Sequence, residues 1–382
     1  MELARLSTPS RPMRILVLNP GSSSLKASLV EQPGDRTLAR VDRDWGADAT
    51  KRADRDDDLA AVLDELGGTD LPLAAVGYRV VHGGSRFVEP ALVNDDVLAA
   101  IRELDDLAPL HNAVAANTIE AGRRRLTDVS HVACFDTAFH ADLPETTRRY
   151  PLPEAWQADW GIRRYGFHGL SVAWSVERTA DLLNRPIEDL QLVVAHLGSG
   201  CSVTAVAGGR SVDTSMGMTP LEGLMMGTRS GSIDPGILLH LLDVGRLPVD
   251  ELAENIAHRS GLLGVSGRSA SVRELEEAAD SGDALAQLAL DMFARRAAAG
   301  IAAVATALVR LDAVVFTGGI GEHAHRMRMR ICGHLSVLGA PQPGEPPDDS
   351  DAVVGTRDGL AVLRVSSRED VVIARQVAAT IG

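Results

Sequence analysis

Two segments of this 382-residue sequence share one layout, and that repetition constrains the fold more than any other feature. Residues 14–18 and 25–30 are short apolar runs on either side of a small, polar, glycine-bearing turn. Residues 190–210 repeat this order around a Gly-Ser-Gly turn at 198–200. Each segment predicts two strands joined by a tight turn. Their similarity favours two related domains that each begin with this unit.

Strand-like and helix-like patterns alternate through the rest of the chain, which is typical of an α/β protein. Acidic residues open a predicted helix that ends at Gly67. An alanine-rich helix is expected over about 283–310, and another helix is expected from Glu322 after the strand pattern "LDAVVFTGG". The length allows two domains with a cleft between them, where small-molecule sites are common.

Composition excludes several classes of partner. The formal net charge of −14 disfavours binding to nucleic acid or anionic lipid, and only 3% of the residues are aromatic, too few for a base-stacking surface. No apolar run is long enough to span a membrane. Three widely separated cysteines favour a reducing, cytoplasmic location. The leader "MELARLSTPSRP" lacks a signal-peptide apolar segment, and Met13 is a second candidate start.

The first turn, "NPGSSSLK", carries a lysine but does not match a P-loop. A P-loop has glycine directly before its lysine and a helix after it, whereas Leu25 precedes Lys26 and strand-like sequence follows. Backbone N–H groups and serine hydroxyls of such a turn can contact an anion, although a purely structural turn remains an alternative. If the two turns face each other, a phosphate chain between them meets donors on both sides.

The segment "TGGIGEHA" (317–324) offers a second interpretation. Gly319, Gly321 and Ala324 fit the G-x-G-x-x-A pattern of dinucleotide-binding folds. Too little chain follows for a complete doubly wound sheet, and no acidic residue ends a clear strand about 20 residues later. A dehydrogenase therefore remains the alternative, and the simpler interpretation is that these glycines allow close approach to a nucleotide.

Charged and polar residues lie at the ends of predicted elements, all but Asp136 in glycine-rich loops. They are Arg79, His82, Asp136, His168 and Arg229. A guanidinium presents a fixed fork of donors to an anion, and a histidine can stabilise a developing phosphoryl charge. Ordinary surface arginines, a loop-capping aspartate and a structural histidine are the alternatives.

Taken together, these segments resemble the acetate kinase family from about Arg14 to the C-terminus. The motifs that carry the resemblance are "VLNPGSSSLK", "RVVHGG", "APLHN", "FDTAFH", "RYGFHGLS", "HLGSGCSV", "GMTPLEGLMMGTRSG" and "FTGGIGEH". The resemblance implies duplicated actin-like ATPase (ribonuclease H-like) domains with an interdomain cleft, over 13–160 plus 371–382 and over 161–370. It also implies a cytoplasmic homodimer that transfers a phosphoryl group reversibly from ATP to acetate, giving acetyl phosphate and ADP, with Mg²⁺ or Mn²⁺.

The resemblance also assigns roles to individual residues. The catalytic group would be Arg79, Asp136, His168 and Arg229. The nucleotide and its phosphates would contact Ser22, Ser24, Lys26, His196, Gly198, Ser199, Gly200, Ser271, Arg273, Gly319, Ile320 and Gly321. The acid's methyl pocket would be lined by Arg79, Val81, Leu110, Phe167 and Pro220. Asn19 and Glu369 would be linked to the metal.

The residue types agree with this chemistry. Acetate is already ionised at neutral pH, because carboxyl groups titrate near pH 4, so its oxygen attacks without a general base. Bringing it to the γ-phosphoryl group at roughly 3 Å costs several kcal/mol at an effective dielectric constant of about 20. Two arginines, a histidine and Mg²⁺ would offset that repulsion. A sugar kinase would instead need a carboxylate to accept the hydroxyl proton.

Four positions depart from the family pattern. Ser199 stands where asparagine is usual, Ser271 and Ser232 stand where acidic residues are usual, and His323 stands where asparagine is common. We expect altered nucleotide affinity with the chemistry retained. A propionate kinase and a weakly active nucleotide-binding relative are the alternative functions.

Overall fold

The computed structural model describes residues 12–21, 24–44, 55–67, 72–105, 107, 111–346 and 348–382. Contacts divide the chain into two compact units. Unit 1 takes in the described residues up to Ala138 together with Arg368–Gly382, and unit 2 is Phe139–Ser367. The domain limits expected from the sequence, after residue 160 and before residue 371, stay a prediction.

Unit 1 is built on a mixed six-stranded sheet in the order β3-β2-β1-β4-β6-β5. Strands β3, β2 and β1 form an antiparallel meander, β1, β4 and β6 run parallel, and β5 is antiparallel to β6. The strands are β1 Met13–Pro20, β2 Ser24–Gln32, β3 Arg36–Asp44, β4 Ala75–Val80, β5 Ala91–Leu92 and β6 Ser130–Phe135.

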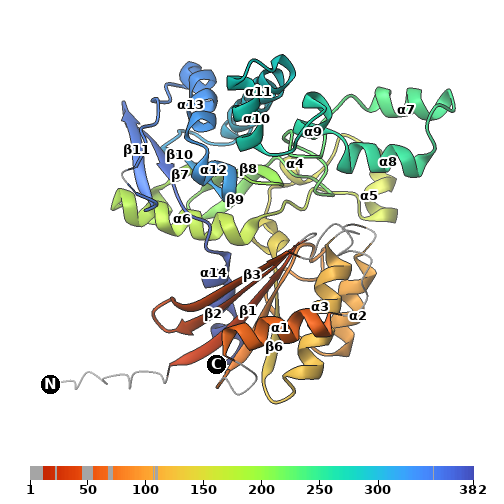
Figure 1. Cartoon of the computed structure of the whole chain (residues 1–382), viewed down its shortest axis with the longest axis vertical. Helices are drawn as coiled ribbons and strands as arrows, with labels where there is room; N and C mark the ends of the chain where they lie inside the picture. The colour runs from red at the N-terminus through yellow and green to blue at the C-terminus, as the bar shows by residue number, and fades with distance from the viewer. Residues whose placement is uncertain are drawn as a thin grey trace. The chain divides into compact units, whose positions relative to one another are not determined.

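Unit 2 repeats this topology in its own six-stranded sheet (Figure 1). Written from the meander, the order is β9-β8-β7-β10-β12-β11, with the same parallel and antiparallel pairs as in unit 1. The strands are β7 Gln191–Leu197, β8 Cys201–Ala207, β9 Arg210–Thr214, β10 Ala313–Thr317, β11 Ala352–Arg357 and β12 Leu360–Arg364. The predicted duplicated α/β fold is therefore confirmed.

Helices cover both faces of each sheet. In unit 1 they are α1 Asp56–Leu66, α2 Asp95–Glu103, α3 Asn112–Arg125 and α14 Glu369–Ile381. The helices of unit 2 are α4 Glu145–Arg148, α5 Glu154–Trp160, α6 Gly169–Leu183, α7 Pro235–Asp243, α8 Val249–His258, α9 Gly261–Ser266, α10 Val272–Asp280, α11 Ala284–Ala305, α12 Gly318–His323 and α13 His325–His334. Of these, α6, α11 and α12 pack against its sheet. In the described part of the chain, none of these helices is both long and apolar enough to cross a membrane.

Two neighbouring residues of β4 show how the helices of unit 1 are placed. A Cβ on Gly77 would lie 2.6 Å from Ile373 and 2.7 Å from Val377, so glycine is needed for α14 to pack here. The hydroxyl of Tyr78 fills the space beside Gly122 of α3. Because successive side chains point to opposite faces of a sheet, α14 and α3 cover opposite faces.

The core of each unit consists of buried aliphatic side chains between its sheet and helices. In unit 1, Leu16 and Val76 pack with residues of α1 and α3. In unit 2, Val172 and Val176 of α6 pack with Val194 and other strand residues. Helix α1 begins with three aspartates and ends at Gly67, which has φ +118°, as the sequence predicted.

Two helix limits differ from the sequence prediction. The alanine-rich helix ends at Ala305 rather than near residue 310, because the Thr306 hydroxyl bonds to the Ala303 carbonyl and turns follow. The helix expected from Glu322 begins instead at Gly318. Gly318 adopts φ +76°, which lets the chain turn from β10 directly into α12.

Candidate active site

The end of the unit 1 sheet gathers four polar residues. Asn19 lies near the end of β1, Arg79 near the end of β4, Asp136 directly after β6 and Glu369 at the start of α14. The first three meet because β1, β4 and β6 are parallel, so their carboxyl ends share one edge of the sheet. We call these four residues the charged cluster.

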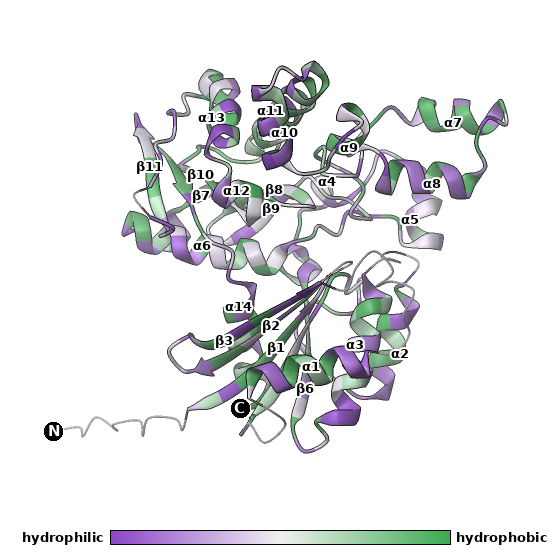
Figure 2. Ribbon diagram, in the orientation of Figure 1, coloured by the Kyte–Doolittle hydropathy of each residue, from purple (hydrophilic) through white to green (hydrophobic). Residues whose placement is uncertain are grey.

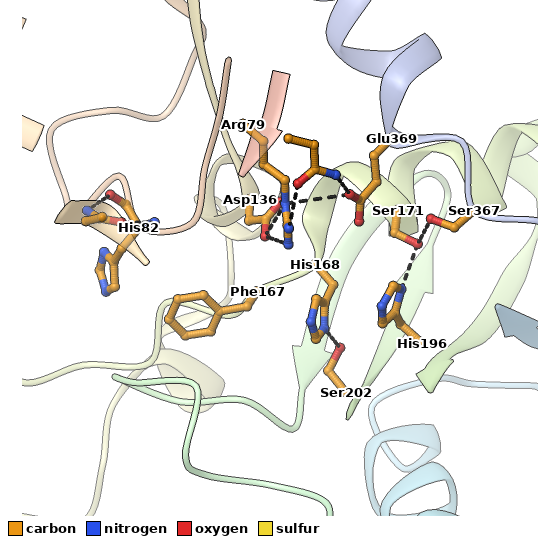
Figure 3. Close-up of polar contacts among 12 residues, drawn as sticks. Arg79, His82, Asp136, Phe167, His168, Ser171, His196, Ser202, Ser367 and Glu369 are labelled. Carbon is orange, nitrogen blue, oxygen red and sulfur yellow. Dashed lines mark hydrogen bonds and ion pairs between the residues drawn. The ribbon is translucent and has the colours of Figure 1, made fainter. Parts of the chain in front are cut away.

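Arg79 is the centre of the charged cluster (Figure 3). Its Nε lies 3.1 Å from each oxygen of Asp136, and its Nη2 donates to Asp136 Oδ2 at 2.5 Å. Its Nη1 donates to Asn19 Oδ1 at 3.1 Å, and Asn19 Nδ2 donates to Glu369 Oε2 at 2.7 Å. Arg79 Nε also lies 3.7 Å from Glu369 Oε2. The guanidinium is therefore oriented from three directions.

Electrostatics keep Arg79 charged. Burial opposes its charged form, but the charges of Asp136 and Glu369 and the hydrogen bonds to Asp136 outweigh burial and raise the pKa of the guanidinium. Asp136 is fully buried, so its partner Arg79 compensates a charge that would otherwise be costly. One guanidinium faces two carboxyl groups, so a further cation is electrostatically favoured beside the cluster.

The first turn lies beside the charged cluster on the same sheet. Gly21 N donates to Ser24 O at 2.7 Å, and Lys26 of β2 pairs in register with Asn19. Directly paired residues of neighbouring strands place their side chains on one face. Lys26 is exposed, and Ser22 lies outside the described residues. The structure therefore brings Ser24 and Lys26 to the edge where Asn19 lies.

The second turn is bordered by two stacked histidines. The rings of His168 and His196 are 4.1 Å apart between centroids and inclined by 17°. His168 Nδ1 lies 2.9 Å from Ser202 Oγ, and His196 Nδ1 lies 2.8 Å from Ser171 Oγ (Figure 3). Two imidazolium charges at this separation repel by about 4 kcal/mol at an effective dielectric constant of 20. The stack therefore favours at most one protonated ring.

Arg229 approaches the same turn. A Cβ on Gly200 would lie 3.3 Å from His168 Nε2 and 3.6 Å from Arg229 Nη1, so both side chains border this glycine. Arg229 Nη1 donates to the Pro220 carbonyl at 3.2 Å. Burial lowers the pKa of Arg229, and no ion pair joins it to a carboxylate among the described residues. A partly dehydrated cation of this kind favours an anion as its neighbour.

The predicted nucleotide segments gather around the turn. A Cβ on Gly198 would lie 3.9 Å from Gly319 N, so the turn and the start of α12 are adjacent. Gly318 packs against the backbone of Leu197, where a Cβ would approach within 2.8 Å. Nothing lies within 4 Å of a Cβ placed on Gly319. Ile320 and Gly321 continue α12, and open space borders Gly319.

Ser199 and the segment before α10 also converge. A Cβ on Gly227 would lie 3.7 Å from Ser199 O and 3.3 Å from Ala270 O. Ser271 caps α10, because its Oγ accepts a hydrogen bond from Glu274 N at 3.4 Å. The serine that replaces the expected acidic residue thus retains a helix-capping role. Arg273 follows in the first turn of α10 and is exposed.

The residues predicted for the methyl pocket fall in both units. Val81 is buried in unit 1, Phe167 is buried in unit 2, and Pro220 of unit 2 is half-buried. Leu110 lies outside the described residues. His82, another candidate, is fully buried in its loop, where its backbone and ring bond to Asn112 and Gly84. Within the described residues His82 has a structural role.

Sequence reasoning missed the side chains that orient the two histidines. Ser202 lies beside His168, while Ser171 and Ser367 lie behind His196. Ser171 belongs to the motif "RYGFHGLS" and Ser202 to "HLGSGCSV", so their loop positions were the available signal. No pattern in the sequence connects Ser367 with Ser171, because 196 residues separate them.

Comparisons with known proteins agree with this geometry. The sequence model of the Acetokinase family matches residues 14–375. An acetate kinase of Deinococcus radiodurans is 44% identical, over 97% of this chain and 98% of that protein. The structure of a propionate kinase from Francisella tularensis has a TM-score of 0.84 at 35% identity, over 95% of this chain and 98% of that one. Porphyromonas gingivalis acetate kinase has a TM-score of 0.83 at 32% identity, over 97% and 100%. The chain belongs to the acetokinase family.

Proposed function

We propose that this protein transfers a phosphoryl group reversibly from ATP to the carboxylate of acetate, giving acetyl phosphate and ADP. Full-length similarity to acetate kinases supports this assignment. The structural observation that carries it is Arg229, a half-buried cation at a glycine turn with no carboxylate partner among the described residues. Such a group suits a transferring phosphoryl group.

In this mechanism an acetate oxygen attacks the γ-phosphorus and the bond to the ADP oxygen breaks. No proton has to leave the nucleophile, so the protein positions the two anions and compensates their charge. To Arg79 of unit 1, and to Arg229 and His168 of unit 2, we assign the task of compensating the charge of the phosphoryl group. Asp136, which accepts three hydrogen bonds from Arg79, holds that guanidinium in place.

A divalent cation fits the donor set of the charged cluster. Asn19 and Glu369 supply an amide oxygen and a carboxylate, the oxygen ligands that Mg²⁺ and Mn²⁺ accept. No group of three or more metal-ligating His, Cys, Asp or Glu side chains occurs among the described residues, which agrees with Mg²⁺ held by few protein ligands and by substrate phosphates. The bound ion would neutralise charge on the phosphate oxygens.

The nucleotide would occupy the glycine-rich part of unit 2. Backbone of 198–200 would face the phosphates together with His196, while Gly319, Ile320, Gly321, Ser271 and Arg273 would border the nucleoside. In unit 1, Ser22, Ser24 and Lys26 would meet the phosphates. The close approach of Gly198 to Gly319 supports this arrangement, because neither glycine has a side chain that would block a ligand.

Acetate and propionate differ by one methylene, which is worth only about 1 to 3 kcal/mol in an apolar pocket. Val81, Leu110, Phe167 and Pro220 would line that pocket. Similarity to a propionate kinase keeps propionate as the second candidate. The test is an assay with MgATP, hydroxylamine and either acid: acyl hydroxamate should form, with a higher kcat/KM for acetate. Absence of hydroxamate above background with both acids contradicts the proposal.

A nucleotide-binding relative without appreciable turnover is the second class of function, motivated by Ser199, Ser232 and Ser271. Calorimetry that shows MgADP binding together with no acyl phosphate formation would support it. Rapid turnover would exclude it. A dehydrogenase would require binding of a nicotinamide nucleotide, and the same calorimeter tests that directly.

We also propose a cytoplasmic homodimer. Helix α7 has no buried residue, and much of its ribbon has the colour of hydrophobic residues in Figure 2. Its exposed apolar side chains include Ile237, Leu239 and Leu242. A second copy would cover this surface. Light scattering should give twice the chain mass of 40.5 kDa, and Leu239→Glu should shift it toward one chain mass. The three cysteines are free and buried, as suits a reducing compartment.

A further inference from the structure

A chain of polar groups lies behind His196 in unit 2. Ser171 Oγ is 2.8 Å from His196 Nδ1, and Ser367 Oγ donates to Ser171 Oγ at 3.2 Å (Figure 3). Ser367 N donates to Glu322 Oε1 at 2.9 Å. Ser171 lies in the first turn of α6 and is fully buried, Ser367 follows β12, and Glu322 belongs to α12. Residues from three separate parts of the fold thus form one chain of polar contacts, which ends at an imidazole nitrogen of His196.

This hydrogen-bond pattern favours one tautomer of His196. A serine hydroxyl has one hydrogen. The Ser171 oxygen accepts the hydrogen of Ser367, and within the part of the chain that the structure describes, the hydrogen of Ser171 has His196 Nδ1 as its acceptor. Nδ1 is then an acceptor, so a neutral ring carries its hydrogen on Nε2. His196 Nε2 is therefore a hydrogen-bond donor.

The donor faces the second turn. His196 Nε2 lies 3.8 Å from the position that a Cβ on Gly198 would occupy. A neutral His196 is also compatible with a protonated His168 in the 4.1 Å stack, whereas a second charge would be repelled. The two rings can thus perform different tasks: one supplies a neutral N–H, and the other can carry positive charge.

We propose that Ser171 and Ser367 are positioning residues that hold His196 as the Nε2–H tautomer and direct this N–H toward a nucleotide phosphate at the 198–200 turn. The inference rests on the proposed kinase function and deepens it. The Glu322 carboxylate accepts a hydrogen bond from the Ser367 backbone N–H, so polar contacts connect α12 through Ser367 and Ser171 to His196. Loss of the Ser171 hydroxyl removes the contact that favours this tautomer of His196.

The first test reads the tautomer directly. The full-length protein, labelled with ¹⁵N-histidine, is measured by long-range ¹H–¹⁵N correlation, and His196 is assigned by the signal lost in His196→Gln. Wild-type His196 should show an acceptor Nδ1 and a protonated Nε2. Ser171→Ala should lose this pattern. Ser175→Ala is the matched control, because Ser175 is buried on the same helix but bonds to the Ser171 backbone carbonyl.

The second test measures nucleotide affinity and turnover. Ser171→Ala should raise the dissociation constant for MgADP by about three- to tenfold, the effect of one hydrogen bond, while the KM for acetate stays unchanged. Ser175→Ala should bind MgADP as the wild type does. Ser171→Thr keeps a hydroxyl and should recover part of the affinity. Ser367→Ala should also raise the dissociation constant for MgADP, but by a smaller factor. If Ser171→Ala does not fold, Ser367→Ala takes its place in this test.

The outcomes separate the inference from the proposed function. A protonated Nδ1 on wild-type His196, or unchanged MgADP affinity in both serine variants, overturns the positioning role. If the wild type produces no acyl phosphate but shows the expected tautomer and the expected loss of MgADP affinity, the proposed acetate chemistry fails and the positioning role stands.

Discussion

The two units share a sheet topology but differ in what their strands carry at the equivalent edge. Leu18 of β1 pairs with Tyr78 of β4, and the next residues along, Asn19 and Arg79, are hydrogen-bonded to each other. In unit 2, His196 of β7 pairs with Thr317 of β10. Asp136 and Ser367 each follow their third parallel strand at the corresponding position. Unit 1 therefore holds an amide, a guanidinium and a carboxylate where unit 2 holds an imidazole and two hydroxyls.

The helices show the same correspondence between the two units. Glu369, at the start of α14, accepts a hydrogen bond from Asn19, while Ser171, in the first turn of α6, bonds to His196. Each sheet thus uses the start of one packed helix to orient the side chain near the end of its first strand. The comparison teaches that the duplicated scaffold fixes where a side chain lies, and residue type decides whether the edge is charged or neutral.

Removing Arg79 should have the largest effect. Arg79→Ala should lower kcat by about 10³-fold, because an aligned donor to the transferring group is lost. It should also lower the free energy of unfolding by about 3 kcal/mol, since Asp136 is left buried without its partner. Steady-state kinetics and urea unfolding measure both. Arg40→Ala, which breaks a half-exposed ion pair with Asp370, is the control and should change neither by much.

Removing Arg229 from unit 2 should lower turnover without the loss of stability expected when Arg79 is removed from unit 1. Arg229→Ala should lower kcat by about 10²-fold, yet the free energy of unfolding should stay level or rise, because no carboxylate in the described residues depends on this cation. Urea unfolding of Arg79→Ala and Arg229→Ala under the same conditions measures both free energies of unfolding. Equal destabilisation by Arg79→Ala and Arg229→Ala would contradict the contrast between a paired and an unpaired arginine.

Acid should weaken unit 2 through His140. Burial lowers the pKa of this histidine to about 4, and its ring bonds to Ser211 and to the Phe167 carbonyl. Its stabilising contribution is therefore complete above the unfolded-state pKa near 6.5 and is lost as the pH falls toward 4. Between pH 7 and pH 5 the loss is about 2 kcal/mol. Unfolding at both pH values should show a smaller difference in His140→Gln than in the wild type.

Restoring asparagine at the second turn should have the smallest effect. Ser199→Asn adds an amide long enough to reach a phosphate and should lower the KM for ATP about two- to fivefold, within the range of one hydrogen bond. The control is Ser336→Asn, in the 3-10 helix Leu335–Leu338. Ser202→Asn cannot serve as the control, because Ser202 contacts His168. An unchanged KM for ATP in Ser199→Asn would show that this position does not limit nucleotide binding.

Sequence patterns predicted local structure and the duplication well, because apolar runs and glycine turns act over a few residues. The two strand–turn–strand units and the end of α1 at Gly67 were found in this way. The start of α12 was not, because Gly318 and Gly319 were counted with the preceding strand pattern, whereas the positive φ of Gly318 turns the chain straight into a helix. Ser271 as a helix cap and the hydroxyl pair behind His196 depend on partners that only the folded chain brings together.

The packing of α14 against Gly77 has a consequence for biosynthesis. Unit 2 is one continuous stretch of chain, whereas the sheet of unit 1 is covered on one face by Glu369–Ile381. Chains emerge from the ribosome N-terminus first, and domains fold as units once their residues are available. The sheet of unit 1 is therefore covered on this face only after Glu369–Ile381 has been synthesised, and unit 2 can complete its core while unit 1 still exposes the face around Gly77.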